Sequence, residues 1–588
     1  MRLFWALIGA LGLSSVGIGQ THVSNTVVVY DSKASKAEVF AASEMAAYLS
    51  KITGQHVKLS TSGKQVNADE IVVGQGELAR KLCRDIRWNR LGPEEVVIRS
   101  TPHGLVVAGG NPRGTVYAVY RLLGRLGVRW WTPWATDVPK DPNLVIPKLN
   151  VREVPGMEFR SPYGYSNLDN AWTSENCSNF GANIPDEEHG GQVDYAGFVH
   201  TYYALVPPDP YFKQHPEWFS MIDGKRTTDN AQLCTTDPKL RAFVLEQVKK
   251  ELRKQPTATI VSVSQNDCFN PCQCDRCRAL VKEQGSESAL VLDLANYVAD
   301  GIKDEFPNVA VDTLAYQWSR HAPKSMKPRP NVIVRLCSIE CDFGQPLDAP
   351  KNAAFAKDII DWSRLTHRLY VWDYITNFAH YIQPLPNEAV LGPNIRFFAN
   401  NGVKGIFEEG DYTSNGGAMM ELKCWLLAQL LWDPKADDGA LTKEFLTGYY
   451  GTAGDAIGRY LQLIDDAGAK TACTIYQGPD APYFSYSVLR DSEKLWQEAE
   501  AAVANDTDKL WRVRQSHLSI QYVFLNRWDE LKKAAAAAGD PWLLPPTRDE
   551  LVKQWLTVAT GPGPKGWSPV TAVNEGSLKP EDFVKGFH

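Results

Sequence analysis

Residues Thr259–Cys277 read TIVSVSQNDCFNPCQCDRC, an apolar start followed by a polar, cysteine-rich end. The β-branched run at positions 260–263 predicts a buried strand. That strand ends in Asn266 and Asp267, and a helix-like segment follows the cysteine loop. Because the carboxyl ends of the strands face the active site in barrels of parallel strands, Asp267 is the first catalytic candidate.

Strand and helix signals alternate on both sides of this stretch, from about Met157 to Trp432. This alternation is typical of an α/β fold and predicts a (β/α)8 TIM-like barrel. The eight predicted strands are Glu158–Tyr163, Gly197–Leu205, Gln232–Thr235, Thr259–Ser264, Val309–Ala315, Val332–Cys337, Leu369–Trp372 and Val403–Phe407. The predicted helices between them are Pro238–Arg253, Ser288–Phe306, Asn352–Leu365 and Asn387–Asn400.

Two further regions flank the predicted barrel, which we place at residues 151–435. Residues 21–150 mix strand and helix signals and predict a small N-terminal α/β domain. After residue 435 the strand signals stop, so residues 436–588 predict a helical C-terminal region, whose last forty or so residues we interpret as a tail packed on the barrel. A glycine-bearing turn, Gly109–Gly114, lacks the GxGxxG spacing and a Walker lysine, so we interpret it as structural.

The size, charge and aromatic content of the chain limit the classes of function that it can have. The chain has 588 residues and is 44% hydrophobic, enough for two or three cores. A formal net charge of −6 with mixed signs gives no basic face, so no nucleic-acid partner is expected. The 18 Trp, 23 Tyr and 21 Phe residues serve core packing, but Trp and Tyr beside polar groups also suit stacking against sugar rings.

The N-terminus, residues 1–20, carries an early arginine, an apolar run and then small residues. This order predicts a secretory signal peptide, because the apolar run is too short to cross a bilayer. No later run reaches the length of a membrane span. We therefore expect an exported protein, periplasmic or extracellular, and make no prediction of its oligomeric state.

Export makes the 11 cysteines candidates for disulfides. Four of them follow Asp267 with the spacing C-x3-C-x-C-x2-C: Cys268, Cys272, Cys274 and Cys277. Zinc is one possibility, since paired thiolates in a tight turn match structural zinc sites. One or two local disulfides are favoured in an exported chain, and either linkage would hold the loop that carries Asp267. We predict no catalytic metal and no cofactor.

Polar and aromatic side chains gather where the predicted strands stop. In chain order they are His200, Asn266, Asp267, Tyr316, Trp318, Glu340, Asp342, Trp372, Asp373, Tyr374, Glu408, Glu409 and Asp411. Hydrolysis of a glycosidic bond requires a carboxylic acid that protonates the leaving oxygen and a carboxylate that activates water or attacks the anomeric carbon. Aromatic walls position the sugar ring, although barrels of other chemistries also collect carboxylates at this rim.

Several of these residues have structural alternatives. Asp411 is better interpreted as the cap of a helix that starts near Gly416, and Asp342 could simply order its loop. His200 fits a hydrogen-bonded core histidine as well as a substrate contact. Whether Glu408 or Glu409 faces the interior depends on strand parity, and a one-residue shift reverses the answer.

A series of ordered motifs resembles a known bacterial family. The motifs are HTYYALVP, HPEWF, QLCTTDP, RLCSIECDF, YVWDY and GIFEEGDYTSNGG, with a closing LLAQLLWDP. They are similar to the DUF4838-type family, a domain of unknown function found among carbohydrate-degrading proteins, over about residues 25–435. The stretch RGTVYAVYRLLGRLGVRWWTP resembles the small α/β domain that precedes the barrel in α-glucuronidases and β-hexosaminidases. These relatives imply an exo-acting glycoside hydrolase with carboxylate catalysis.

The resemblance has one departure. The β-hexosaminidases carry an Asp-Glu pair at the end of the fourth strand, where this sequence has Asn266–Asp267. That difference argues against substrate-assisted hexosaminidase chemistry. It leaves Asp267 at the position that matches the usual fourth-strand acid.

We therefore expect an exported, exo-acting glycoside hydrolase whose substrate is an oligo- or polysaccharide of bacterial, plant or host origin. Asp267 is predicted as general acid and Glu408 or Glu409 as base or nucleophile, with Asp373 and Glu340 in reserve. The predicted substrate-binding residues are His200, Asn266, Tyr316, Trp318, Trp372 and Tyr374. A non-catalytic glycan-binding protein on the same fold is the alternative, and a metal-dependent hydrolase is a third possibility.

Overall fold

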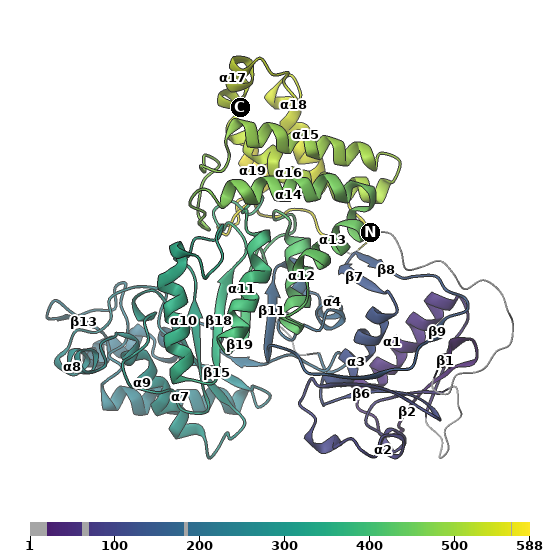
Figure 1. The fold of residues 1–588 in the computed structure, drawn as a ribbon. Helices are drawn as coiled ribbons and strands as arrows, with labels where there is room; N and C mark the ends of the chain where they lie inside the picture. Colours follow the sequence, from purple (N-terminus) through teal and green to yellow (C-terminus); the bar gives the residue numbers. More distant parts are fainter. Residues whose placement is uncertain (1–19, 62–69, 182–185, 566, 588) are drawn as a thin grey trace. The chain divides into compact units, whose positions relative to one another are not determined.

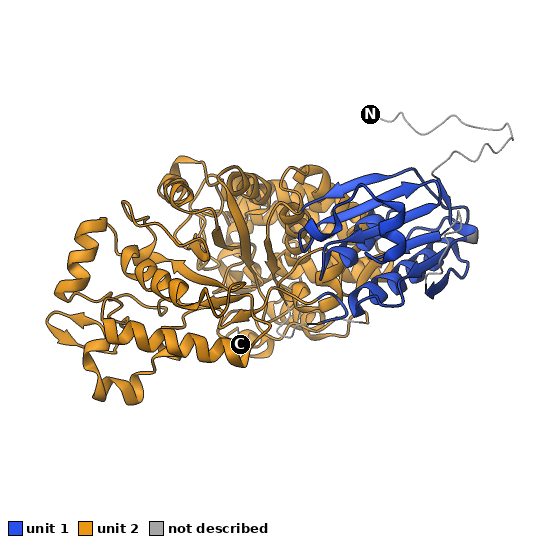
Figure 2. Ribbon diagram, turned by 90° about the horizontal axis from the view of Figure 1, so that it is seen from below, with its two compact units in different colours: residues 1–129, 138–154, 187–190 blue, residues 130–137, 155–186, 191–588 orange. Residues whose placement is uncertain are grey.

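The computed structural model describes residues 20–61, 70–181, 186–565 and 567–587. The predicted signal peptide, residues 1–20, lies outside this part of the chain except for its last residue. Figure 2 shows two compact units. Unit 1 is built from Met1–Arg129, Val138–Val154 and Glu187–Gly190, and unit 2 from Trp130–Asp137, Pro155–Asp186 and Gly191–His588. None of the helices in the described ranges is long and apolar enough to span a membrane.

Unit 1 contains a six-stranded mixed sheet in the order β10-β5-β6-β4-β2-β3. The strands are β2 (Val27–Tyr30), β3 (Lys58–Thr61), β4 (Glu70–Val73), β5 (Val96–Thr101), β6 (Gly104–Gly109) and β10 (Asn150–Glu153). Helix α1 (Lys36–Thr53) begins at a Ser35–Glu38 capping box and ends at Gly54, and α2 (Glu77–Leu82) and α3 (Gly114–Arg125) follow later strands. The unit also holds the short antiparallel pair β1 (Thr21–His22) and β9 (Val145–Ile146).

The glycine-bearing turn before α3 is a close-packed backbone junction. A Cβ atom added to Gly110 would lie 1.6 Å from the carbonyl oxygen of Gly92. A Cβ atom on Gly109 would lie 2.3 Å from the backbone of Gly114. Only glycine allows this approach, which agrees with a structural function for the turn.

Unit 2 is organised by a seven-stranded parallel sheet in the order β11-β19-β18-β17-β16-β15-β12. Its strands are β11 (Phe159–Tyr163), β12 (Tyr195–Ala196), β15 (Ile260–Ser262), β16 (Ala310–Ala315), β17 (Val332–Cys337), β18 (Leu369–Tyr374) and β19 (Val403–Glu409). The sheet curls into an open barrel, because ring centroids of Phe159 on β11 and Tyr195 on β12 lie 5.9 Å apart. The predicted fold class is confirmed, with seven strands in place of eight.

Two of the predicted strands are wrong. The second strand stops at Ala196, and Tyr202–Leu205 forms helix α5, because Gly197 and His200 have φ angles of 68° and 53° that interrupt an extended strand. The third, Gln232–Thr235, is not part of the sheet, and Leu233 makes only an isolated antiparallel bridge with Phe219. The Gln232 side chain instead bonds to the loop that follows β15.

Helices cover the outer face of the curled sheet (Figure 1). They are α7 (Pro238–Lys254), α8 (Asp275–Gln284), α9 (Ser288–Ile302), α10 (Ala353–Leu365), α11 (Glu388–Asn400) and α12 (Met420–Trp432). Asp237 caps α7 by accepting hydrogen bonds from the backbone N–H groups of Lys239 and Leu240, and Pro238 occupies the first turn. The four predicted helices correspond to α7, α9, α10 and α11 within a few residues. Short elements before α7 are α4 (Asn170–Glu175), α6 (Pro208–Gln214), β13 (Met221–Ile222) and β14 (Lys225–Arg226).

The C-terminal region is helical, as predicted. It comprises α13 (Asp438–Tyr450), α14 (Gly454–Gly468), α15 (Tyr486–Ala502), α16 (Thr507–Asn526), α17 (Trp528–Ala538), α18 (Arg548–Thr560) and α19 (Pro580–Lys585). The described residues after α18 form a C-terminal tail that returns to the barrel. There the backbone N–H of Tyr381 donates to the carbonyl of Val573 at 2.8 Å, and that of Glu575 donates to Phe378 at 2.9 Å.

Candidate active site

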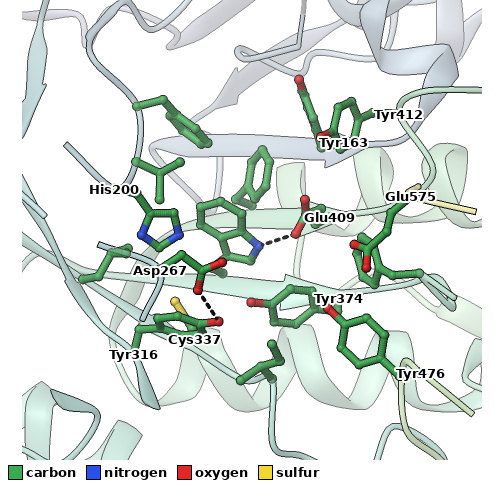
Figure 3. Close-up of a pocket in the computed structure, with 17 residues that line it drawn as sticks. Tyr163, His200, Asp267, Tyr316, Cys337, Tyr374, Glu409, Tyr412, Tyr476 and Glu575 are labelled. Carbon is green, nitrogen blue, oxygen red and sulfur yellow. Dashed lines mark hydrogen bonds between the residues drawn. The ribbon is translucent and has the colours of Figure 1, made fainter. Parts of the chain in front are cut away.

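A pocket of about 330 Å³ lies where the strands of unit 2 end (Figure 3). Its size falls at the lower end of the range for small-molecule sites, about 300–1,000 Å³. Its wall is largely aromatic, formed by Tyr163, Phe198, Tyr316, Trp372, Tyr374, Phe378, Phe407, Tyr412 and Tyr476. Besides tyrosine phenols and the Cys337 thiol, the described lining carries three carboxyl groups, Asp267, Glu409 and Glu575, and the imidazole of His200.

Strand parity decides between the two neighbouring glutamates of β19. The barrel interior is packed by residues that include Ile333, Tyr370 and Phe407. Ile406, on the opposite face of β19, belongs to the core shared with the outer helices. Because side chains alternate along a strand, Glu409 shares the interior face with Phe407 and lines the pocket, whereas Glu408 points to the helix layer.

Glu409 is held by its neighbour on β18. The indole N–H of Trp372 donates a hydrogen bond of 2.8 Å to Oε2 of Glu409 (Figure 3). Burial raises the pKa of Glu409 to about 7, the hydrogen bond from Trp372 acts in the opposite direction, and the charges of Glu575 and Asp267 add to the rise. A carboxyl group that is partly protonated near neutral pH suits a general acid.

Asp267 lies in the loop after β15 and accepts a hydrogen bond from an oriented hydroxyl group. The Tyr316 hydroxyl donates to Oδ1 of Asp267 at 3.1 Å (Figure 3). The Gln317 side chain donates to the same Tyr316 oxygen at 2.9 Å, which directs the phenol proton towards Asp267. Burial raises the pKa of Tyr316, so the phenol keeps this proton. The phenol O–H therefore occupies one oxygen of the Asp267 carboxyl group and orients it.

The loop that carries Asp267 is fixed by side chains from outside the sheet. The Gln232 amide oxygen accepts from the backbone N–H of Asn266 at 2.9 Å, and its amide nitrogen donates to the carbonyl of Cys268 at 2.6 Å. Asn266 itself donates to the carbonyl of Ala231 at 3.0 Å. Trp318 donates its indole N–H to the same Cys268 carbonyl at 3.1 Å. Asn266 and Trp318, both predicted to bind substrate, therefore hold this loop and lie outside the pocket lining.

The other predicted carboxylates also lie outside the lining. Glu408 is buried on the outer face, where burial and the charge of Asp373 raise its pKa well above the usual value. Asp373 accepts hydrogen bonds from the Ser338 hydroxyl and the backbone N–H of Tyr374, and burial raises its pKa to about 6. Glu340 is exposed and pairs with Arg320 at 2.9 Å.

His200 lies in the pocket wall with a strained backbone. Its φ of 53° is uncommon for a residue other than glycine, and such strain gathers at functional sites. Its Nδ1 bonds to the carbonyl oxygen of Gln265 at 2.8 Å. Since a carbonyl can only accept, Nδ1 carries the proton, which leaves Nε2 able to bind a ligand hydroxyl.

Two further aspartates of the sequence analysis, Asp342 and Asp411, lie outside the pocket lining. Asp342 orders its loop by accepting hydrogen bonds from the backbone N–H groups of Gly344 at 3.1 Å and Cys473 at 3.2 Å. The interpretation of Asp411 as a helix cap is wrong, because α12 begins at Met420 and its cap position is Met419.

Sequence reasoning missed four polar residues of the lining: Tyr163, Tyr412, Tyr476 and Glu575. Tyr163 is the last residue of a correctly predicted strand, so the rule applied to the other strand ends could have found it. Tyr412 is the third residue after β19, close enough to the strand end for the same rule to reach it. Tyr476 and Glu575 come from the C-terminal region, where no sequence pattern connects them to the barrel. Glu575 enters the pocket because the C-terminal tail pairs with the loop after β18.

The pocket lining carries acidic side chains without lysine or arginine, as far as the chain is described. These acidic side chains are three carboxylates, Asp267, Glu409 and Glu575. The described residues hold one group of side chains close enough to ligate a metal ion, and that group is four cysteines outside the pocket lining. The described lining therefore offers no lysine or arginine that could pair with an anionic ligand.

The family model of a domain of unknown function, DUF4838, matches residues 130–462, more than half of the chain. The protein belongs to the DUF4838 family. The matched residues of this DUF4838 protein include the whole parallel sheet with Asp267 and Glu409, but not Glu575. A second model, glycosyl hydrolase family 67 N-terminus, matches residues 17–122, which confirms the predicted resemblance of the N-terminal domain. No curated protein matches the sequence.

The DUF4838 protein is similar in fold to solved glycoside hydrolases. A family GH115 4-O-methyl-α-glucuronidase with specificity for decorated arabinogalactans aligns with a TM-score of 0.60 and 13% identity, covering 92% of this chain and 77% of that one. A GH89 protein from Clostridium perfringens, solved with GlcNAc-α-1,4-galactose, aligns with a TM-score of 0.53 and 10% identity over 89% of this chain and 65% of its own. At these identities the likeness concerns the fold.

Proposed function

We propose that this DUF4838 protein is an exported, exo-acting glycoside hydrolase that removes a terminal sugar from an oligo- or polysaccharide. The observation that carries the proposal is the meeting of Asp267 and Glu409 in one aromatic pocket at the carboxyl edge of the sheet. A protonated acid and a carboxylate facing one ligand are the minimum that glycosidic hydrolysis requires. The modest pocket volume favours recognition of a chain end over a long internal stretch.

The environments of the two carboxyl groups favour an assignment of functions opposite to the one expected from sequence. Glu409, whose pKa is raised to about 7, would protonate the leaving oxygen. Asp267, which accepts the proton of Tyr316 in a hydrogen bond, would act as the carboxylate that activates water or attacks the anomeric carbon. Separation of two carboxyl groups into acid and base by their surroundings is a recurring device in glycosidases.

The aromatic residues would position the sugar. Trp372 presents an indole ring to the pocket and is held by Glu409, so its face can stack on the apolar side of a sugar ring. Tyr316 and Tyr374 line the same space, and Nε2 of His200 is available to a hydroxyl group. Three carboxylates without a lysine or arginine beside them favour a neutral or basic terminal sugar over a uronic acid.

The proposal is tested with a panel of neutral aryl glycosides of both anomeric configurations. Glu409→Gln and Asp267→Asn should each lower kcat by about 10²–10⁴-fold on any substrate that the wild type cleaves, because each removes a proton-transfer or nucleophilic group. Glu408→Gln is the matched control, since its side chain faces the helix layer and burial keeps its pKa high. Full activity in both pocket variants, or loss in the control alone, would refute the assignment.

A non-catalytic glycan-binding protein remains the second candidate, and the extensive aromatic wall is the observation that favours it. Such a protein would bind oligosaccharides through Trp372 and Tyr374 without turnover. Equal glycan binding by wild type and by Glu409→Gln, together with no cleavage anywhere in the panel, would select this function.

A further inference from the structure

Four cysteines from two distant segments meet outside the pocket. The Sγ atoms of Cys234, Cys272, Cys274 and Cys277 all lie within 4.8 Å of one another. Cys234 precedes α7, whereas the other three lie in the loop and first turn that lead into α8. All four are buried in one cluster with Leu290. The group of four cysteines expected from the sequence is therefore wrong in one member. Cys268 is not part of the cluster, and Cys234 is.

The spacing of the sulfur atoms distinguishes a metal site from disulfides. Cys234 Sγ lies 3.6 Å from Cys274 Sγ and 3.9 Å from Cys277 Sγ. Four sulfurs around a tetrahedral zinc ion with Zn–S bonds of about 2.3 Å are about 3.8 Å apart. A disulfide joins two sulfurs at about 2.05 Å and leaves the other pair separate. The local disulfides expected from sequence are not formed, since Cys268, Cys272, Cys274 and Cys277 are free thiols.

The surroundings of the cluster supply donors to the sulfurs. The backbone N–H of Met221 donates to Cys272 Sγ at 3.3 Å, and the Arg226 guanidinium lies 3.5 Å from the same atom. Both come from the β13–β14 hairpin, which therefore contacts the cluster. The Thr236 hydroxyl lies 3.1 Å from Cys277 Sγ. Such outer contacts orient ligands and compensate thiolate charge in metal sites.

We propose that Cys234, Cys272, Cys274 and Cys277 bind one structural zinc ion. Four thiols around one point would each release a proton to solvent as zinc binds, and the resulting four-sulfur site leaves no open position for substrate or water. Zinc is the metal that such a closed tetrahedral sulfur site favours when no redox chemistry is required.

The zinc ion would hold the loop that delivers Asp267. Cys272 follows Asp267 by five positions, and Cys234 follows Gln232, the residue that clamps Asn266 and Cys268. The metal thus fixes both segments whose contacts set the direction of the Asp267 carboxylate. The zinc ion would position Asp267 and would not itself contact the substrate.

The test is metal analysis of the purified full-length chain after growth with zinc. Wild type should carry one zinc per chain by mass spectrometry of the metals. The variants Cys272→Ser and Cys277→Ser should lose most of the zinc. Cys268→Ser is the control and should keep the zinc. Cys268 lies in the same loop, but its Sγ contacts the carbonyl of Ala231 at 3.4 Å and is not one of the four clustered sulfurs. Wild type reconstituted with Co²⁺ should show the intense absorption of tetrahedral cobalt thiolates.

The reconstitution measurement does not depend on whether a variant folds. Wild type without zinc, or with iron in its place, would overturn the proposal. So would disulfide-linked peptides among the four cysteines, or equal zinc loss in Cys268→Ser and Cys272→Ser.

Discussion

The indole N–H of Trp372 and the carboxylate of Glu409 are joined by a 2.8 Å hydrogen bond between neighbouring strands of the sheet. This bond favours the ionised carboxylate, while burial and the nearby charges of Glu575 and Asp267 favour the protonated form. The pKa of Glu409 is thus set by a hydrogen bond that lowers it and by burial and nearby charges that raise it. A single substitution can remove either the hydrogen bond from Trp372 or the charge of Glu575.

Replacement of Trp372 by phenylalanine keeps an aromatic ring but removes the donor. The pKa of Glu409 should rise, because the bond that stabilised its charged form is gone. If Glu409 is the general acid, the basic limb of kcat/KM against pH shifts to higher pH. Trp318→Phe is the control, because the Trp318 indole donates to a backbone carbonyl and not to Glu409. This variant should not shift the basic limb of the profile. A downward shift in Trp372→Phe would contradict the electrostatic argument.

Replacement of Glu575 by glutamine should act in the opposite direction. The negative charge of Glu575 raises the pKa of Glu409, so its removal makes Glu409 easier to deprotonate. The basic limb of the same profile should then shift to lower pH. Glu581→Gln, an exposed glutamate in the first turn of α19, is the matched charge control and should show no shift. An unchanged limb in Glu575→Gln would mean that the tail does not influence the acid.

The charge of the pocket predicts its choice of sugar. An aryl hexoside should be cleaved at least ten times faster, in kcat/KM, than the hexuronide of the same configuration, because no lining lysine or arginine neutralises the substrate carboxylate. Glu575→Gln should narrow the difference by removing one repulsive charge. A preference for the uronide in wild type would overturn the substrate class without affecting the two catalytic carboxylates.

The barrel interior contains an ion pair that should be costly to break. Arg335 and Asp312 are fully buried and 2.9 Å apart, and the guanidinium lies 4.6 Å from the ring centroid of Phe198. Arg335→Met should destabilise the protein by about 3–5 kcal/mol, since it leaves Asp312 buried without its partner. The double variant Arg335→Met/Asp312→Leu should recover much of this loss in urea unfolding. Additive losses in the double variant would argue against pairing as the cause.

His517 should make stability depend on pH. Burial lowers its pKa, but contacts of 2.8 Å with each of Glu493 and Glu500 outweigh this and raise it to about 9. The folded state therefore holds a proton that the unfolded state loses above its ordinary value of 6.5. This stabilisation is complete below pH 6.5 and is lost as pH rises to about 9, by on the order of 3 kcal/mol. Thermal unfolding of His517→Gln should lack this contribution between the two pH values.

The sequence predicted the regular part of the barrel well. Strands β16, β17, β18 and β19 are apolar runs bounded by turns, and the predicted ranges differ from the observed ones by two residues or fewer. The two failures occurred where a polar or glycine-containing stretch resembled a strand. At residues 197–205 the positive φ angles end the strand, and at residues 232–235 a side chain bonds to a loop that lies far along the sequence.

The candidate site was predictable only in part. Strand ends located Asp267, Tyr316, Trp372 and Tyr374, which all line the pocket. His200 also lines it, although the strand in which the sequence placed His200 is not formed. The choice of Glu409 over Glu408 needs strand parity to one-residue accuracy, which a hydrophobic run does not provide. Cys234 and Glu575 could not be identified, because each is brought to its cluster by folding across a long stretch of chain.

The return of the C-terminal tail has a practical consequence. Glu575 lies well beyond residue 462, where the family match ends, so a shortened protein that stops with the barrel would lack one wall of its own pocket. Surveys of relatives that align only the matched region would overlook this residue when they compare substrate preference. In this protein residues that follow the family match complete the pocket, so a chain cut before Glu575 would keep every strand of the parallel sheet and still lack one of the three carboxylates of its lining.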